Sequence, residues 1–409
     1  MQPIILTPQR SRALEFGIYR DGDNNLDASQ SLTVAQALQS SRTDDAVEYT
    51  VEDTTGLKIA GGDIVEGKKR TDSFTIANGQ IGDPQVGKAR NMASESNLAK
   101  FVAQTLDNAE ASGAKQTWID LVDHGGGDGG GLETHTGAVM SMPDMAQAII
   151  DGVALHAKEH PEDAGRGIDG VVANQCLMDT MGFADALSRV GVKYLAASPE
   201  TMLSPGVPTT VADDIARNVD TPDAMAKAVV NDVMRTSYRD IDGDSFGTAA
   251  AFDVLDLAPN KLANAERAIK SFNDDASSTN APAQATLRDD VRSIEGMVRF
   301  PQATPDMPWH ADRPAIAMYD AIAGDASLPK ELRAQAGAAA KAIGSLVMAH
   351  KESRAFGPFG GSSYSDAVGP TIHAPVARKQ IDPWAPKINE TNNAFYKNVD
   401  QSKFVGVLA

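Results

Sequence analysis

The sequence predicts an α/β fold: a mostly parallel sheet flanked by helices on both faces, with a helical C-terminal extension and a late added strand. The first half alternates short apolar runs with helical patterns, the order expected when helices connect parallel strands. The second half holds Ala-rich helical stretches instead. A hydrophobic content of 42% and a charged content of 22% over 409 residues are typical of a folded chain.

The expected strands are short runs rich in β-branched and aromatic residues, each bounded by turn residues. They lie at 15–19, 46–51, 73–77, 117–122, 170–174 and 193–198. A helix over 96–110 stops before Gly113, and a second helix begins at Pro143; both repeat apolar residues along one face. In such sheets, ligands bind at the carboxyl ends of the strands.

The second half is expected to be mainly helical. Its helices are expected at 222–237, 256–272 and 328–351. A polar linker at 273–284 and a strand at 369–375 complete it. We therefore expect a central domain over 14–255 and a helical, loop-rich region over 256–409 that packs on the same core.

The chain is acidic. Its 37 Lys and Arg against 55 Asp and Glu give a formal charge of -18, which repels phosphate backbones and anionic lipid surfaces. Nucleic acid and membranes are therefore excluded as expected partners. No apolar run approaches the roughly 18 to 20 residues that span a bilayer, and residues 1–15 lack the apolar core of a signal peptide. The oligomeric state stays open.

A single cysteine, Cys176, excludes an internal disulfide framework and a multi-cysteine metal site. A lone thiol is either a small buried hydrophobe or a nucleophile. Cys176 lies two residues after the strand expected at 170–174, at the edge of the sheet where ligands bind.

His124 follows the strand expected at 117–122 and opens a run of glycines. A phosphate-binding loop needs Gly-Lys-Ser or Gly-Lys-Thr, which is absent, and a dinucleotide loop must open directly into a helix, which this run does not. Two interpretations remain: a flexible turn with a hydrogen-bonded histidine, or a catalytic histidine with the Gly125 amide as an oxyanion donor.

Cys176 favours the catalytic interpretation. It ends its own strand one strand-helix unit after His124, and adjacent parallel strands bring their carboxyl ends side by side. A cysteine nucleophile needs such a partner, because an imidazole must protonate the leaving amine after the sulfur attacks.

Four blocks of sequence, in order, carry a family resemblance. They are IYRDGDNNLD (18–27), WIDLVDHGGG (118–127), VVANQCLMD (171–179) and YLAASPETMLSPGVP (194–208). With weaker matches at 247–262 and 368–375, the chain resembles the clostripain family of cysteine peptidases, relatives of caspases, gingipains and legumain. The resemblance implies a caspase-like sheet and peptide or protein substrates.

The resemblance also implies roles for individual residues. Cys176 is expected to be the nucleophile and His124 the acid/base, with the amides of Gly125 and Cys176 binding the oxyanion. The substrate-binding residues that the resemblance implies are Asp23, Asn174, Gln175, Ser198 and Glu200.

The chain also departs from the family pattern. Relatives that cleave after Arg or Lys usually carry Asp two residues before the cysteine, where this chain has Asn174. A basic P1 preference is therefore not implied, although Glu200 lies close in sequence and offers a charge.

Two sets of side chains suggest metals. Asp240, Asp242 and Asp244 offer oxygen ligands for calcium, although an EF-hand is excluded and a solvated acidic turn is the alternative. His156 and His160 have the i, i+4 spacing of two zinc ligands but lack a clear third ligand, which favours an exposed helix end.

Three hypotheses follow. The first is a cysteine endopeptidase that requires no cofactor and allows calcium; the second is a catalytically silent relative that binds peptides in the same cleft. The third is a zinc-dependent hydrolase that uses His124, His135, His156 and His160. Because the resembled family is mostly exported, we expect a bacterial exported protein.

Overall fold

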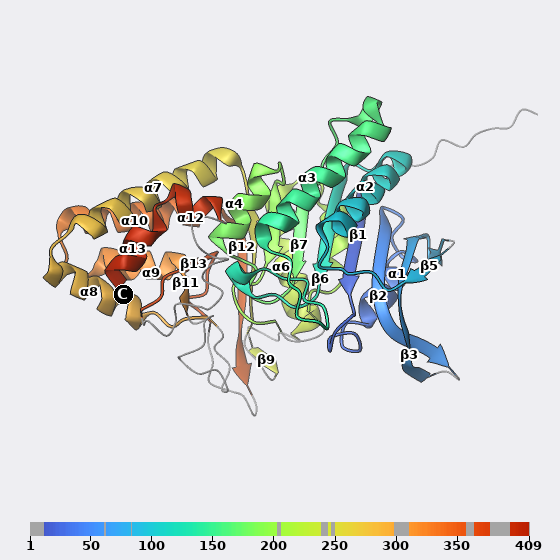
Figure 1. Cartoon of the computed structure of the whole chain (residues 1–409), viewed down its shortest axis with the longest axis horizontal. Helices are drawn as coiled ribbons and strands as arrows, with labels where there is room; N and C mark the ends of the chain where they lie inside the picture. The colour runs from blue at the N-terminus through green and yellow to red at the C-terminus, as the bar shows by residue number, and fades with distance from the viewer. Residues whose placement is uncertain are drawn as a thin grey trace, which may run out of the picture.

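The fold is built on one large sheet with helices on both faces and a helical lobe beside it (Figure 1). The computed structural model describes residues 12–60, 63–82, 84–202, 206–238, 244–246, 250–297, 311–356, 364–376 and 393–408. Within these residues the sheet has eleven strands. The predicted α/β fold is confirmed.

The strands are β1 (Leu14–Asp21), β2 (Val47–Ala60), β3 (Asp63–Ala77), β4 (Gln80–Ile81), β5 (Gln85–Lys88), β6 (Gln116–Val122), β7 (Gly170–Asn174), β8 (Tyr194–Ala197), β9 (Asp244–Phe246), β10 (Ala250–Asp256), β11 (Asp312–Pro314), β12 (Val347–Phe356) and β13 (Thr371–His373). The longer helices are α1 (Leu32–Ser40), α2 (Glu95–Ser112), α3 (Met142–Glu159), α4 (Met181–Arg189), α6 (Pro222–Asp232), α7 (Pro259–Ser278), α8 (Ala281–Ser293), α9 (Ala315–Gly324) and α10 (Lys330–Gly344). The shorter ones are α5 (Val211–Arg217), α12 (Ala394–Asn398) and α13 (Gln401–Leu408).

The centre of the sheet is parallel, and its edges are mixed. Strands β2, β1, β6, β7 and β8 run side by side in the same direction. Strand β3 pairs with β2 antiparallel at one side, while β10 and then β12 continue antiparallel beyond β8. All six strands expected in the first half are present.

Alternate side chains of each central strand enter different cores. In β6, Trp118 and Val122 pack with α5 and α6, whereas Ile119 and Leu121 pack with α2, α3 and α4. All four are fully buried, and burial of each such side chain contributes about 1.5–3 kcal/mol. The sheet is therefore covered on both faces, as parallel sheets require.

Helices α2 and α3 lie side by side on one face of the sheet (Figure 1). Gly113 ends α2 in the left-handed conformation at φ 66°, and Ser141 caps α3 by accepting a hydrogen bond from the Asp144 amide. Gly152 lets the helices approach closely, because a Cβ there would lie 2.5 Å from Val102 Cβ. The C-terminal ends of both helices lie at the edge of the sheet opposite the strands' carboxyl ends.

Two expectations for the second half are wrong. The polar stretch 273–284 is largely helical: α7 continues to Ser278, and the Asn280 side chain accepts a hydrogen bond from the Ala283 amide to cap α8. Residues 347–351, expected as the end of a helix, belong to β12, which pairs with β10 in the main sheet. The strand expected at 369–375 is present as β13, which pairs with β11 in a separate sheet.

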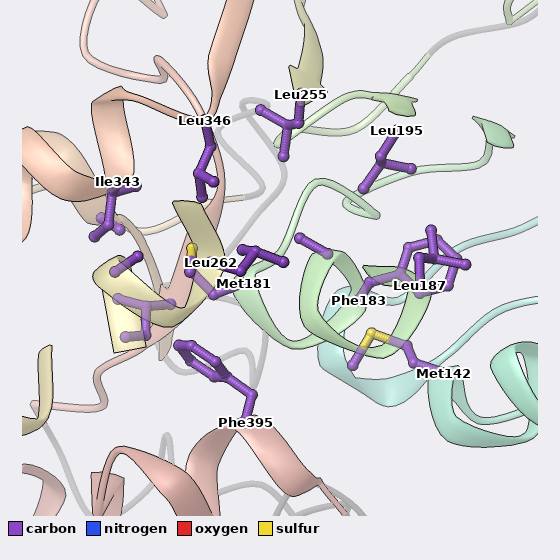
Figure 2. Packing of buried hydrophobic residues seen from close by; sticks show 14 of the residues in the cluster. Met142, Met181, Phe183, Leu187, Leu195, Leu255, Leu262, Ile343, Leu346 and Phe395 are labelled. Carbon is purple, nitrogen blue, oxygen red and sulfur yellow. The ribbon is translucent and has the colours of Figure 1, made fainter. Parts of the chain in front are cut away.

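A continuous hydrophobic core joins the sheet to the C-terminal helices. Figure 2 shows Met142 and Phe183, from α3 and α4, in the same cluster as Leu262, Ile343 and Phe395 from the C-terminal half. The division at 255/256 stays a prediction. Among the described residues, no helix combines the length and the hydropathy needed to cross a membrane.

Candidate active site

The site lies where β6 and β7 end. The two strands pair in parallel, with Val122 opposite Asn174, so the chain leaves both strands at the same edge of the sheet. Two residues beyond each strand end stand His124 and Cys176. Both line a pocket with a volume of about 120 Å³. Its other lining residues are Leu26, Ser29, Gln30, Asp123, Asn174, Gln175, Met202 and Gly206.

The imidazole of His124 is held by Asn25 from the loop after β1. Its Nε2 lies 2.7 Å from Asn25 Oδ1, and because a carbonyl oxygen only accepts, Nε2–H is the donor. The neutral ring therefore carries its lone pair on Nδ1. Partial burial lowers the pKa of His124, an effect that the Glu133 carboxylate opposes, so the ring is mainly neutral at pH 7.

The thiol of Cys176 is partly exposed and touches the backbone of Met202, in the segment after β8. The Met202 amide donates to Sγ at 3.3 Å, and the Met202 carbonyl lies 3.6 Å from Sγ. Burial raises the pKa of the thiol, the Met202 contact lowers it, and the carboxylates of Glu200 and Asp123 raise it further. The resting thiol is therefore protonated and needs a base in order to react.

The backbone of Gly125 lies against the backbone of Cys176. A Cβ on Gly125 would lie 2.2 Å from Cys176 O and 2.9 Å from Cys176 N, so only glycine fits. Among the described residues neither amide donates to a carbonyl. Leu177, directly after the cysteine, adopts φ 65°, a conformation that costs about 1–3 kcal/mol for a residue with a side chain. Such strain is typical of functional sites.

A hydrogen-bond network fixes the loop behind His124. Asn24 Nδ2 donates to Asp123 Oδ1 at 2.5 Å and to Glu133 O at 2.7 Å. Gln175 Nε2 donates to His124 O at 3.2 Å, which ties the two strand ends together. Burial, reinforced by the nearby Asp21 carboxylate, raises the pKa of Asp123 well above its usual range.

Of the predicted substrate-binding residues, Asn174 and Gln175 line the pocket. Asn174 is committed to the backbone of Val207, accepting from its amide at 2.8 Å and donating to its carbonyl at 3.1 Å. Ser198 and Glu200 are buried outside the pocket lining. The Glu200 carbonyl accepts from the Leu177 amide at 3.1 Å, so this residue braces the turn after the cysteine.

Asp23 lies beside the pocket, not in its lining. It pairs with Lys69 and with His135, whose Nδ1 is 2.5 Å from Asp23 Oδ2. These two partners line an open hollow of about 540 Å³ that shares His124 with the pocket. Burial raises the pKa of Asp23, but the hydrogen bonds and charges of Lys69, and to a smaller extent of His135, outweigh it and lower that pKa below its ordinary value.

The expected metal ligands are not gathered at the pocket. Asp240 and Asp242 lie outside the described residues, as does the side chain of Asp244, so calcium stays a prediction. His156 and His160 lie at the C-terminal end of α3, about 20 Å along that helix from the glycine run. They cannot share a metal with His124, so the four-histidine zinc site is wrong.

Two functional contacts escape sequence reasoning. Asn25 belongs to the quoted Asp-Asn-Asn-Leu segment, but its bond to His124 spans 99 residues and has no local signal. The Met202 contact is made by the backbone, so residue identity gives no indication of it.

Comparison with models of protein families and with curated proteins finds no match. Solved structures do match over 95% of this chain. An inactive zymogen of a C11 protease from Parabacteroides distasonis is 16% identical, with 98% of that chain covered and a TM-score of 0.60. A secreted C11 cysteine protease from Bacteroides thetaiotaomicron is 12% identical, with 99% of that chain covered and a TM-score of 0.64. A further structure, also of a secreted C11 cysteine protease from Bacteroides thetaiotaomicron but in complex with an irreversible peptide inhibitor, matches with a TM-score of 0.63. The chain therefore has the caspase-like α/β fold of the C11, or clostripain-family, cysteine proteases.

Proposed function

We propose that this protein is a cysteine endopeptidase that cleaves peptide bonds through an acyl-enzyme on Cys176. The observation that carries the proposal is the position of His124 and Cys176, at the ends of adjacent parallel strands and in the lining of one pocket. The fold shared with C11 cysteine proteases supports the same class of reaction.

The protonation states suggest the order of events. Cys176 starts as a thiol and His124 as a neutral imidazole with its lone pair on Nδ1, because Nε2–H donates to Asn25. His124 takes the thiol proton as sulfur attacks the peptide carbonyl carbon. The amides of Gly125 and Cys176 then stabilise the oxyanion that forms.

The second half of the reaction reverses these roles. The protonated His124 gives its proton to the departing amine, the carbon–nitrogen bond breaks, and a thioester on Cys176 remains. His124 next takes a proton from water, whose oxygen attacks the thioester. Collapse of that intermediate releases the acid product and returns the proton to sulfur.

We propose further that the pocket takes an uncharged P1 side chain. Among its lining residues Asp123 is the one carboxyl group. It is buried, burial raises its pKa well above the usual range, and one of its oxygens already accepts a hydrogen bond from Asn24, so it is a poor partner for a cationic side chain. Asn174 adds no charge, and its amide is hydrogen-bonded to the backbone of Val207. Export remains an expectation, which the secreted relative supports.

Labelling with acyloxymethyl ketone peptides varied at P1, read by intact mass, tests the proposal. We expect one adduct at Cys176, fastest with uncharged P1, and loss of the adduct in Cys176→Ala and His124→Ala. Absence of labelling by every probe, with and without calcium, would instead identify a silent peptide-binding relative. Fastest labelling with P1 Arg or Lys would contradict the uncharged pocket.

A further inference from the structure

A cluster of histidines and carboxylates joins α2 to α3 far from the catalytic pocket. It contains Asp107 and Glu110 from the last turns of α2, His156 and His160 from the end of α3, and Asp163 from the turn that follows. The sequence gives His156 and His160 no third ligand; the fold supplies it from the neighbouring helix.

Asp107 faces both imidazoles. Its Oδ1 lies 2.7 Å from His156 Nδ1 and 3.5 Å from His160 Nε2. A tetrahedral zinc ion with bonds of about 2.0–2.1 Å places its ligand atoms about 3.3 Å apart. These two separations bracket that value. The two rings are stacked, with centroids 5.0 Å apart and planes 16° apart, so one ring must also turn for both lone pairs to meet at one ion.

The second nitrogen of each ring faces another carboxylate. His160 Nδ1 lies 2.5 Å from Glu110 Oε2, and His156 Nε2 lies 3.5 Å from Asp163 Oδ2. A carboxylate behind each histidine is the usual outer shell of a metal site, because it orients the ring and strengthens its lone pair.

His156 supplies an independent indication of a ligand. Its side chain is fully buried, yet its Nε2 makes no hydrogen bond within the described residues. A buried nitrogen without a hydrogen bond is costly, and a metal on Nδ1 would turn Nε2–H toward Asp163.

The electrostatics favour a cation. The negative ends of two helix dipoles converge here with the carboxylates of Asp107, Glu110 and Asp163. Among the described residues, the ion pairs bring one basic side chain to this cluster: Arg166, which pairs with Asp163. Asp107 and Glu110 therefore face histidines alone.

We propose that Asp107, His156 and His160 bind one divalent transition-metal ion of the zinc class, with Glu110 and Asp163 as outer partners and water as the fourth ligand. The ion links α2 to α3, which already approach closely at Gly152. Its role is structural, and it does not depend on the proposed peptidase activity.

The test is metal binding by the full chain, carried out in the Cys176→Ala variant so that the thiol cannot bind the metal. After chelation and dialysis, we expect the protein to bind one equivalent of Zn²⁺, measured by competition with a chromophoric chelator. We expect Co²⁺ to give the d–d absorption of a tetrahedral site. With Zn²⁺ at about 100-fold the Kd, the melting temperature should rise by about 2 °C or more.

His160→Gln and Asp107→Asn should each weaken Zn²⁺ binding by about 10-fold or more, and at the same Zn²⁺ concentration the rise in melting temperature should fall to about half or less. Both side chains are partly exposed, so the fold should survive, which circular dichroism checks. His135→Gln, at an exposed histidine in the open hollow, is the matched control and should leave binding unchanged. Absence of Zn²⁺ binding, or binding lost in the control instead, would overturn the proposal.

Discussion

Gly125→Ala probes the contact between the two strand ends. The added Cβ would lie 2.2 Å from the Cys176 carbonyl oxygen, and a Cβ contact below 3.0 Å is essentially never observed, so the backbones must separate by about 0.8 Å. A displacement of about 1 Å at a catalytic group costs about 100-fold in rate. The same shift moves both proposed oxyanion donors, each worth about 100-fold or more.

The assay is the second-order rate of Cys176 labelling by the best acyloxymethyl ketone, with melting temperature measured in parallel. We expect Gly125→Ala to label at least about 100-fold more slowly. Gly129→Ala is the matched control from the same glycine run, because a Cβ there meets nothing within 4 Å, and it should label at a rate close to that of the unsubstituted protein. A Gly125→Ala rate within about threefold of the unsubstituted rate would refute the oxyanion assignment.

Three further predictions concern single side chains. Asn25→Ala should slow the labelling of Cys176 about 10-fold or more, because His124 loses the acceptor that fixes its tautomer. Asn25→Asp should raise the pKa of His124, because it places a carboxylate beside the ring, and should therefore shift the acid limb of the pH–rate profile to higher pH. Asn174→Asp should shift P1 preference towards Arg and Lys, which the panel of probes varied at P1 measures. It should also lower the free energy of unfolding by about 1–3 kcal/mol, measured by urea titration, because the buried carboxylate would face the Val207 carbonyl. Burial raises the pKa of Asp128 to about 7 in the folded protein, whereas in the unfolded chain it is about 4. The contribution of Asp128 to the free energy of unfolding is therefore fully present below about pH 4 and is lost as the pH rises through about 7. In Asp128→Asn, the free energy of unfolding should fall less steeply between these two pH values.

Each prediction has an outcome that contradicts it. An unchanged pH–rate profile in Asn25→Asp would show that Asn25 does not contact His124 in solution. Unchanged P1 selectivity in Asn174→Asp would place the P1 pocket elsewhere. For Asp128→Asn, the control is Asp289→Asn, whose side chain is 74% exposed; equal flattening in both variants would remove Asp128 as the cause.

Most of the sheet could be predicted because its central strands are buried on both faces. Such strands are short apolar runs, and the sequence around β6 and β7 carries that signal without reference to the rest of the chain. The strand β12 could not be predicted in this way. Its sequence, VMAHKESRAF, has no apolar alternation, and it is a strand because β10 offers an unpaired edge.

The candidate site could be predicted only in part, for a similar reason. His124 and Cys176 each follow a strong strand signal, so topology alone brings them to one edge. The contacts of Ser198 and Glu200 depend on how the loop after β8 folds back, and these residues brace that loop instead of lining the pocket. Asn25 reaches His124 across the sheet edge, a distance in sequence that no local pattern encodes.

The buried carboxyl of Asp128, in the glycine run, accepts a hydrogen bond from the Tyr396 hydroxyl. In a second such link, the Thr371 amide donates to the Asp179 carbonyl at 2.9 Å, three residues after the cysteine. The ribosome adds Asp128 and Asp179 to the chain long before it adds their partners Tyr396 and Thr371; 268 positions separate Asp128 from Tyr396. A nascent chain that has just produced Cys176, the proposed nucleophile, therefore still lacks the contacts that Tyr396 and Thr371 make with the loops after β6 and β7. For the proposed peptidase, these two contacts predict that the site is completed after the C-terminal helices have emerged and folded, so that incomplete chains would be inactive.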